Sequence, residues 1–82
     1  MKLRRVESSA IEAVGYDGQR RWLEVRWKSQ QRVYRYHRVP AEVYAELLAA
    51  ESVGTYVNQQ VKPRYWYEVV EPEGSYDHDL ID

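Results

Sequence analysis

The residues best suited to ligand chemistry are cations and rings spaced two apart along two short segments. Trp22, Arg26 and Lys28 share one parity in the first segment, and Arg35 and His37 share one in the second. In extended strands this spacing places side chains on a common face. Arginine and lysine neutralise phosphates, and tryptophan or histidine rings stack on unpaired bases. These residues therefore predict a surface, here called the open face, that binds RNA or single-stranded nucleic acid.

The same five residues also fit a purely structural interpretation, in which they bind no ligand. Charged residues on a strand are commonly solvated, and the Trp22 ring could shield the sheet through cross-strand contacts. The sequence leaves both interpretations open. Supplementary cations lie near the ends of the expected strands, where they could extend a basic patch or simply maintain solubility: Arg4, Arg5, Arg20, Arg21, Arg32 and Arg38.

Catalytic and metal-binding patterns are weak in this chain. Ser8 and Ser9 lack a marked base and oxyanion loop, so a turn or capping role is expected. Cysteine is absent and His37 and His78 are the two histidines, which argues against a closed zinc site. Segment 52–55 lacks the Gly-Lys-Ser/Thr ending of a phosphate loop. We predict a protein that is not an enzyme and that needs no metal and no cofactor.

Length and composition favour one small domain. The chain has 82 residues, of which 44% are hydrophobic and 30% charged. It has no apolar run of about 20 residues, and its first residues do not lead into the apolar core of a secretion signal. We therefore expect a cytoplasmic protein with no membrane partner.

Charge is distributed unevenly along the chain. Residues 1–38 hold ten lysines and arginines against four acidic residues, whereas residues 71–82 hold five acidic residues and no lysine or arginine. The tail also lacks the apolar spacing of a helix or strand. We divide the chain into a mildly basic domain, residues 1–70, and an acidic tail, residues 71–82, expected to be disordered. Such a tail could solubilise the protein or compete with nucleic acid for the basic surface.

Hydrophobic periodicity predicts an α+β fold. Segments 11–16, 21–28 and 33–38 are expected to form a three-strand antiparallel meander. Pro40 suits the first position of a helix that runs through residue 50, and Ser52 is the expected N-cap of a second helix that ends before Pro63. Segment 64–70 predicts a fourth strand that joins the sheet. The economical arrangement packs both helices on one face, with Tyr34 and Tyr36 beneath them, their hydroxyls hydrogen-bonded at the edge, and leaves the other face open.

A set of spaced residues runs along most of the chain: Ser8, Ser9, Tyr34, Tyr36, Pro40, Gly54, Tyr56 and Asn58. Their order and spacing over about residues 6–69 resemble the KTSC domain, a family named for its occurrence at the C-terminus of some lysyl-tRNA synthetases, with Gln30-Gln31 and Val57 as departures. The motif residues are mainly structural, and Gly54 is expected to allow close packing between the helices. The resemblance implies a domain for which RNA binding has been suggested.

Another class of function remains open. The rings and the acidic helix face, with Glu42 and Glu46, could contact a host enzyme or a translation-associated protein. An uncovered sheet edge could also pair two copies of the chain, so a monomer or a weak homodimer is expected. Phosphate-driven binding should weaken steeply with salt, whereas an apolar protein interface should barely respond.

Overall fold

The computed structural model describes residues 3–30 and 32–70. The predicted acidic tail lies outside these residues. The elements follow in the order β1 (Arg4–Arg5), β2 (Ile11–Asp17), β3 (Trp22–Trp27), β4 (Val33–Tyr36), α1 (Ala41–Ala49), α2 (Val53–Tyr56), the π-helix η1 (Val57–Val61) and β5 (Tyr67–Val70).

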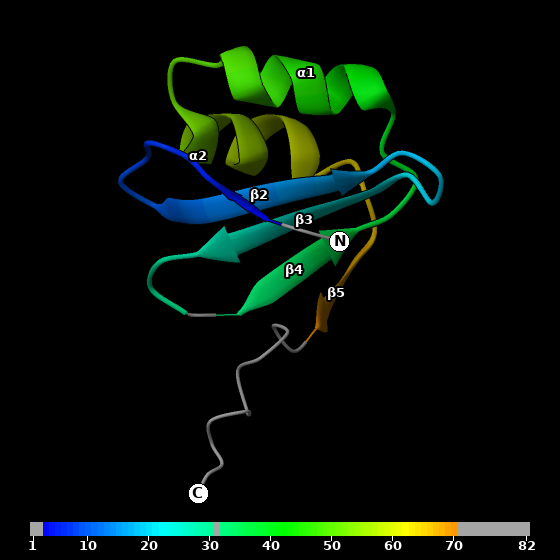
Figure 1. Cartoon of the computed structure of the whole chain (residues 1–82), viewed down its shortest axis with the longest axis horizontal. Coiled ribbons are helices and arrows are strands. Elements are labelled where there is room, and N and C mark those ends of the chain that lie inside the picture. The colour runs from blue at the N-terminus through cyan, green and yellow to red at the C-terminus, as the bar shows by residue number, and fades with distance from the viewer. Residues whose placement is uncertain (1–2, 31, 71–82) are drawn as a thin grey trace, which may run out of the picture.

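The five strands form one sheet in the order β1-β2-β3-β4-β5, and every neighbouring pair is antiparallel. The predicted meander is β2, β3 and β4, and the predicted final strand is β5, which pairs with β4 after the helical segment (Figure 1). The α+β prediction is therefore confirmed. The short strand β1, which pairs Arg4 with Val14 and Arg5 with Ala13, was not predicted.

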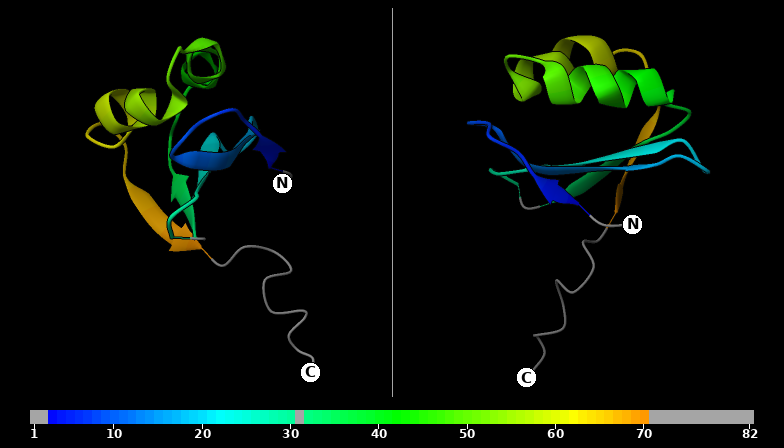
Figure 2. Two further views of the ribbon diagram at one scale, coloured as in Figure 1. Left: turned by 90° about the vertical axis from the view of Figure 1, so that its left-hand side faces the viewer. Right: turned by 45° about the horizontal axis from the view of Figure 1, so that its top comes forward.

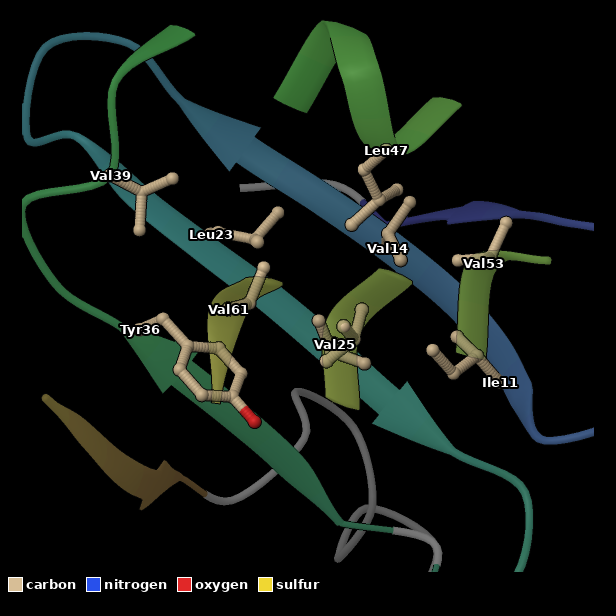
Figure 3. Packing of buried hydrophobic residues seen from close by; sticks show 10 residues of the cluster. Ile11, Val14, Leu23, Val25, Tyr36, Val39, Leu47, Val53 and Val61 are labelled. Carbon is tan, nitrogen blue, oxygen red and sulfur yellow. The ribbon is translucent and has the colours of Figure 1, made fainter. Parts of the chain in front are cut away.

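The helices cover one face of the sheet, as Figure 2 shows. A cluster of buried side chains fills the space between the two layers (Figure 3). Leu23, Val25 and Tyr36 rise from the sheet, while Leu47 and Val61 descend from the helices, and each is fully buried. Since the chain has no cysteine and therefore no disulfide, the burial of these apolar side chains stabilises the fold.

A bulge in β2 sets which of its side chains reach the core. The register shifts between Ile11 and Ala13, so Ile11 lies opposite Trp27 while Val14 lies opposite Val25. Ile11 and Val14 are both fully buried in the core cluster although they are three residues apart. An extra residue in one strand re-aims the side chains that follow it, which strict alternation does not anticipate.

The predicted start of the second helix is confirmed, whereas the first helix begins one residue later than predicted. Ser52 caps α2 as predicted, and its Oγ accepts a hydrogen bond from the backbone N–H of Thr55 at 3.2 Å. Pro40 is instead the N-cap residue of α1, with φ −67° and ψ 153°, and the helix begins at Ala41. The expected second helix changes from α to π geometry at Val57, and Val57 and Val61 are both buried.

Gly54 allows a close approach, but not the one predicted between helices. A Cβ at this position would lie 3.2 Å from the Cβ of Ala10 and 3.9 Å from the Oγ of Ser8. The glycine therefore packs α2 against the turn that precedes β2. The Ser8 hydroxyl holds this turn by accepting hydrogen bonds from the backbone N–H groups of Ala10 and Ile11 at 3.2 and 3.1 Å, which agrees with the predicted turn role of Ser8.

Tyr34 and Tyr36 both face the helices, as predicted. Tyr36 is fully buried, and Tyr34 is half-buried against the same cluster. The prediction that both hydroxyls are hydrogen-bonded is wrong for one of them. The Tyr34 hydroxyl donates to Oε1 of Gln30 at 2.7 Å, whereas the buried Tyr36 hydroxyl has no partner among the described residues. Burial raises the pKa of Tyr36 to about 12, with smaller contributions from Tyr34 and Tyr67.

Candidate nucleic-acid interface

Strand register assembles the open face from three strands. Glu24 of β3 lies opposite Arg35 of β4, and Arg35 lies opposite Glu68 of β5. Trp22 precedes this row on β3 by two positions, and His37 follows it after β4, so all five side chains point away from the helices. The spacing that predicted a shared face for Trp22, Arg35 and His37 is confirmed by this register.

An ion-pair network runs along that row. Arg35 donates from Nε to Oε2 of Glu24 at 2.8 Å, and its Nη1 lies 3.4 Å from Oε2 of Glu68. The same Glu68 oxygen lies 2.9 Å from Nε2 of His37. The Arg35 side chain is 24% exposed, and that of Glu24 is 10% exposed. Two glutamates therefore compensate the guanidinium that the sequence offered as a free phosphate ligand.

Three rings cross the open face beside the network. The Trp22 and His37 rings meet edge to face with centroids 5.7 Å apart, and the His37 and Trp66 rings lie 4.7 Å apart. Guanidinium groups also approach Trp22: the Cζ of Arg35 lies 3.9 Å from the ring centroid, and that of Arg20 lies 5.0 Å away. These are cation–π distances. The run of Trp22, His37 and Trp66 is here called the ring row.

Several residues of the open face are buried. Although no helix of the described residues packs on this side, Glu24 is only 7% exposed, Val33 2% and Ala13 6%. Arg35, with the Trp22 ring against it, covers Glu24, whereas Val33 and Ala13 lie in register with Arg26. The contacts of the Trp22 ring with Arg35 and His37 are of the cross-strand kind that the structural interpretation expects.

The remaining predicted residues lie farther along the face. Arg26 pairs in register with Ala13 and Val33, so it shares the open face, and its Nε is buried with no partner among the described residues. Lys28 follows the end of β3 in a turn and is exposed. Among the described residues, neither side chain interacts with the ring row. Of the five predicted residues, Trp22, Arg35 and His37 therefore lie together, while Arg26 and Lys28 lie apart from them.

Two prominent members of this surface were missed. Trp66 is 67% exposed and is the most accessible ring on the open face. Its backbone carbonyl accepts a hydrogen bond from the His37 N–H at 2.8 Å, which fixes the approach to β5 beside β4. The other is Glu68, which pairs with Arg35 and lies within hydrogen-bonding distance of His37. Both residues belong to a segment with apolar groups on both sides, where alternation gives no orientation.

Arginines with an unusual backbone mark one end of the open face. Arg21 and Arg38 have φ of 61° and 60°, in the left-handed region that costs a non-glycine residue about 1 to 2 kcal/mol. The N–H of Val39 donates to the carbonyl of Arg21 at 2.9 Å, so the two segments lie together. Both arginines are exposed, and they adjoin Trp22 and His37 in the chain.

The turn between β2 and β3 supplies a third arginine at this end. Asp17 accepts backbone hydrogen bonds from Gln19 and Arg20 at 3.0 and 3.2 Å, and its Oδ2 lies 3.3 Å from Nη1 of Arg20. The backbone bond from Arg20 is the main cause that holds the pKa of the Asp17 carboxyl below its usual value. Asp17 thereby organises the turn that carries Arg20 beside the Trp22 ring.

The other family-motif residues serve the helical layer or its surface. The Tyr56 hydroxyl donates to Oε1 of Glu46 at 2.8 Å and links α2 to α1. Desolvation and this hydrogen bond raise the pKa of Tyr56 to about 12. Ser9 and Asn58 are exposed. Across residues 3–30 and 32–70, no helix is long and apolar enough to cross a membrane, and no three His, Asp or Glu side chains gather as a metal site.

Comparison with known proteins supports the resemblance seen in the sequence. The model of the KTSC domain family matches residues 7–65. The chain belongs to the KTSC domain family. A KTSC domain protein from Yersinia pestis has a similar crystal structure, with a TM-score of 0.80 and 28% identity, covering 84% of this chain and 96% of that one.

Two other proteins are similar to this chain in sequence. A protein of Tsukamurella paurometabola is 53% identical over 60 residues, which cover 73% of this chain and 88% of that protein. A protein of Stutzerimonas stutzeri is 44% identical over 69 residues, which cover 80% of this chain and 96% of that protein. The similarity therefore extends over most of each relative's length.

Proposed function

We propose that this KTSC protein is a small non-enzymatic module of the cytoplasm that binds RNA, or another single-stranded nucleic acid, weakly through its open face. The observation that carries the proposal is the ring row, which crosses three neighbouring strand segments and ends in the 67% exposed Trp66. Exposed rings on a sheet accept unpaired bases of any sequence, because every base offers a π-face.

The phosphate contacts come from the arginine end rather than from the centre of the face. Arg35 is held by two glutamates, so a phosphate would have to replace these partners. Arg20 has a 63% exposed side chain whose pair with Asp17 is a surface pair of small energy. With Arg20, Arg21 and Arg38 as the available cations, we expect about three phosphate contacts and a log–log salt slope of about −2 for a single strand.

Fluorescence anisotropy with a labelled mixed-sequence single-stranded RNA tests the ring row. Trp66→Ala should weaken binding about 10-fold, because stacking on one ring contributes about 1 to 3 kcal/mol per base. Tyr67→Ala is the matched control, since Tyr67 is a 47% exposed ring on the opposite side of the same segment. Equal losses in the two variants would show that the open face has no special role.

A second pair of variants tests the cations. The double change Arg21→Gln and Arg38→Gln should flatten the salt slope by about 1.4, because each single-strand contact contributes about 0.7. Arg4→Gln is the control, because Arg4 is exposed and lies opposite Val14, on the helix side of the other sheet edge. Absence of binding at about 50 mM salt, or an equal change with Arg4→Gln, contradicts the proposal.

A further inference from the structure

Exposed apolar side chains concentrate at one edge of the sheet. The described chain has four large hydrophobic residues with high exposure, and three of them lie in the segment 66–69. Tyr67 is 47% exposed and Val69 46%, both on the helix side, while Trp66 is 67% exposed on the open face. Figure 2 shows that β5 slants away from the helical layer, and among the described residues β4 is its one neighbouring strand.

The two edge strands of the sheet, β1 and β5, differ in length and composition. At one edge, β1 is two residues long and both are exposed arginines, a common way to prevent strand addition. At the other edge, β5 pairs only with β4 within residues 3–30 and 32–70. Its sequence Tyr-Glu-Val-Val contains no lysine, proline or bulge. An edge of this composition is suited to pairing with another strand.

The register defines which backbone groups of β5 point outward. The His37 N–H donates to the Trp66 carbonyl, so His37 and Trp66 face each other as a hydrogen-bonded pair. In an antiparallel ladder these pairs alternate, so the inward groups belong next to Glu68, opposite Arg35, and then to Val70, opposite Val33. The N–H and C=O groups of Tyr67 and Val69 therefore point away from β4 and toward the free edge.

We propose that the occupant of this edge is the β5 strand of a second copy of the chain, paired antiparallel about a two-fold axis at Glu68. This register sets Tyr67 opposite Val69 of the partner subunit, and it does so twice. Outward backbone groups then meet outward groups, and the exposed apolar side chains on the helix side cover each other. An isologous contact of this kind is closed and does not propagate into fibres.

Charge and size both limit the strength of this contact. Glu68 meets its own symmetry copy at the axis, and each Glu68 carboxylate contacts Arg35 of its own chain. Because Arg35 is shared with Glu24, the two Glu68 carboxylates are only partly compensated, and their repulsion weakens the pairing. Because β5 is four residues long, the contact falls below the standard interface size of about 1,600 Å² and should give a weak, reversible dimer.

Sedimentation velocity of the full chain, without RNA and from about 10 µM to about 1 mM, measures the association. Val69→Pro removes the outward N–H of residue 69 together with the valine side chain, and proline is tolerated on an edge strand when its lost donor faces solvent. It should raise the dimer Kd at least about 10-fold. Val69→Ile keeps the donor and the apolar side chain, so its Kd should stay within about 3-fold of the parent value.

Val69→Lys is a second disruptive variant that keeps the backbone donor and introduces a charge beside Tyr67 of the partner subunit. It should also weaken the dimer, and near-ultraviolet circular dichroism should show that both variants keep the fold. A chain that stays monomeric at about 1 mM overturns the proposal, even if an added apolar peptide then binds β5. A dimer whose Kd is unchanged by Val69→Pro and Val69→Lys also overturns it, because another surface would then hold the copies together.

Discussion

The unpartnered hydroxyl of Tyr36 leads to a substitution that should stabilise the protein. Tyr36 is fully buried, and its hydroxyl has no hydrogen-bond partner among the described residues. Figure 3 shows the ring in the layer of core side chains. Leaving such a group desolvated costs about 1 to 3 kcal/mol. Tyr36→Phe removes only that oxygen, so the free energy of unfolding at pH 7 should rise by about 1 kcal/mol, and Tm by about 4 to 8 °C.

The same residue makes stability depend on pH in the alkaline range. Burial holds the pKa of Tyr36 near 12 in the folded state, compared with 10.0 for a free side chain. The folded state therefore keeps the proton that the unfolded state loses, and stability is fully present below pH 10 and declines as pH rises toward 12. The full difference corresponds to about 3 kcal/mol. Tyr36→Phe should remove this part of the alkaline decline.

Urea unfolding followed by circular dichroism, at pH 7 and at steps from about pH 9.5 to 11.5, measures both effects. Tyr34→Phe is the control, because the Tyr34 hydroxyl donates to Gln30 and its loss should destabilise by about 0.5 to 1 kcal/mol. The reasoning is refuted if Tyr36→Phe lowers stability as Tyr34→Phe does, since the hydroxyl would then have a partner. An alkaline decline that is unchanged in Tyr36→Phe refutes the pH argument alone.

Three further substitutions test the elements that position the open face. Gly54→Ala should destabilise by about 1 kcal/mol, because its methyl would lie 3.2 Å from a neighbouring alanine, whereas Gly18→Ala, with its nearest contact at 3.8 Å, should change thermal unfolding little. Ser8→Ala removes the acceptor of two backbone N–H groups and should cost about 1 kcal/mol in denaturant titrations, compared with almost nothing for the exposed Ser9→Ala. Arg21→Gly should raise Tm by relieving about 1 kcal/mol of left-handed strain while weakening RNA binding in anisotropy titrations; a lower Tm would argue against that strain.

The sequence predicted the layers well, because binary patterning alone decides them. Alternation in β3 separates Leu23 and Val25 from Trp22 and Arg26, and the structure keeps that separation. The cap at Ser52 was also predictable, since it depends on residues within one turn. The bulge in β2 was not, because it changes which residues share a face without any proline or glycine to mark it.

The candidate site was predicted only in part, because its electrostatics depend on distant segments. The shared face of Trp22, Arg35 and His37 follows from a period of two. The contacts of Arg35 and His37 with Glu68 do not, since Glu68 lies 31 residues beyond His37 on a strand whose register nothing local specifies. Trp66 was missed for the same reason. A sequence pattern thus indicated where cations and rings gather, but not which of them keep a free charge.

Arg35 was predicted to bind nucleic acid, but its ion pairs give it a role in stability. Removing or reversing this charge would leave Glu24, which is 7% exposed, without its 2.8 Å partner. Breaking a buried pair in this way costs about 3 to 5 kcal/mol, which is a large share of the stability of a small domain. Loss of RNA binding in an Arg35 variant would then report unfolding rather than a lost phosphate contact. The exposed ring of Trp66 and the arginines at positions 21 and 38 are the better probes, because each can change while the buried layer stays intact.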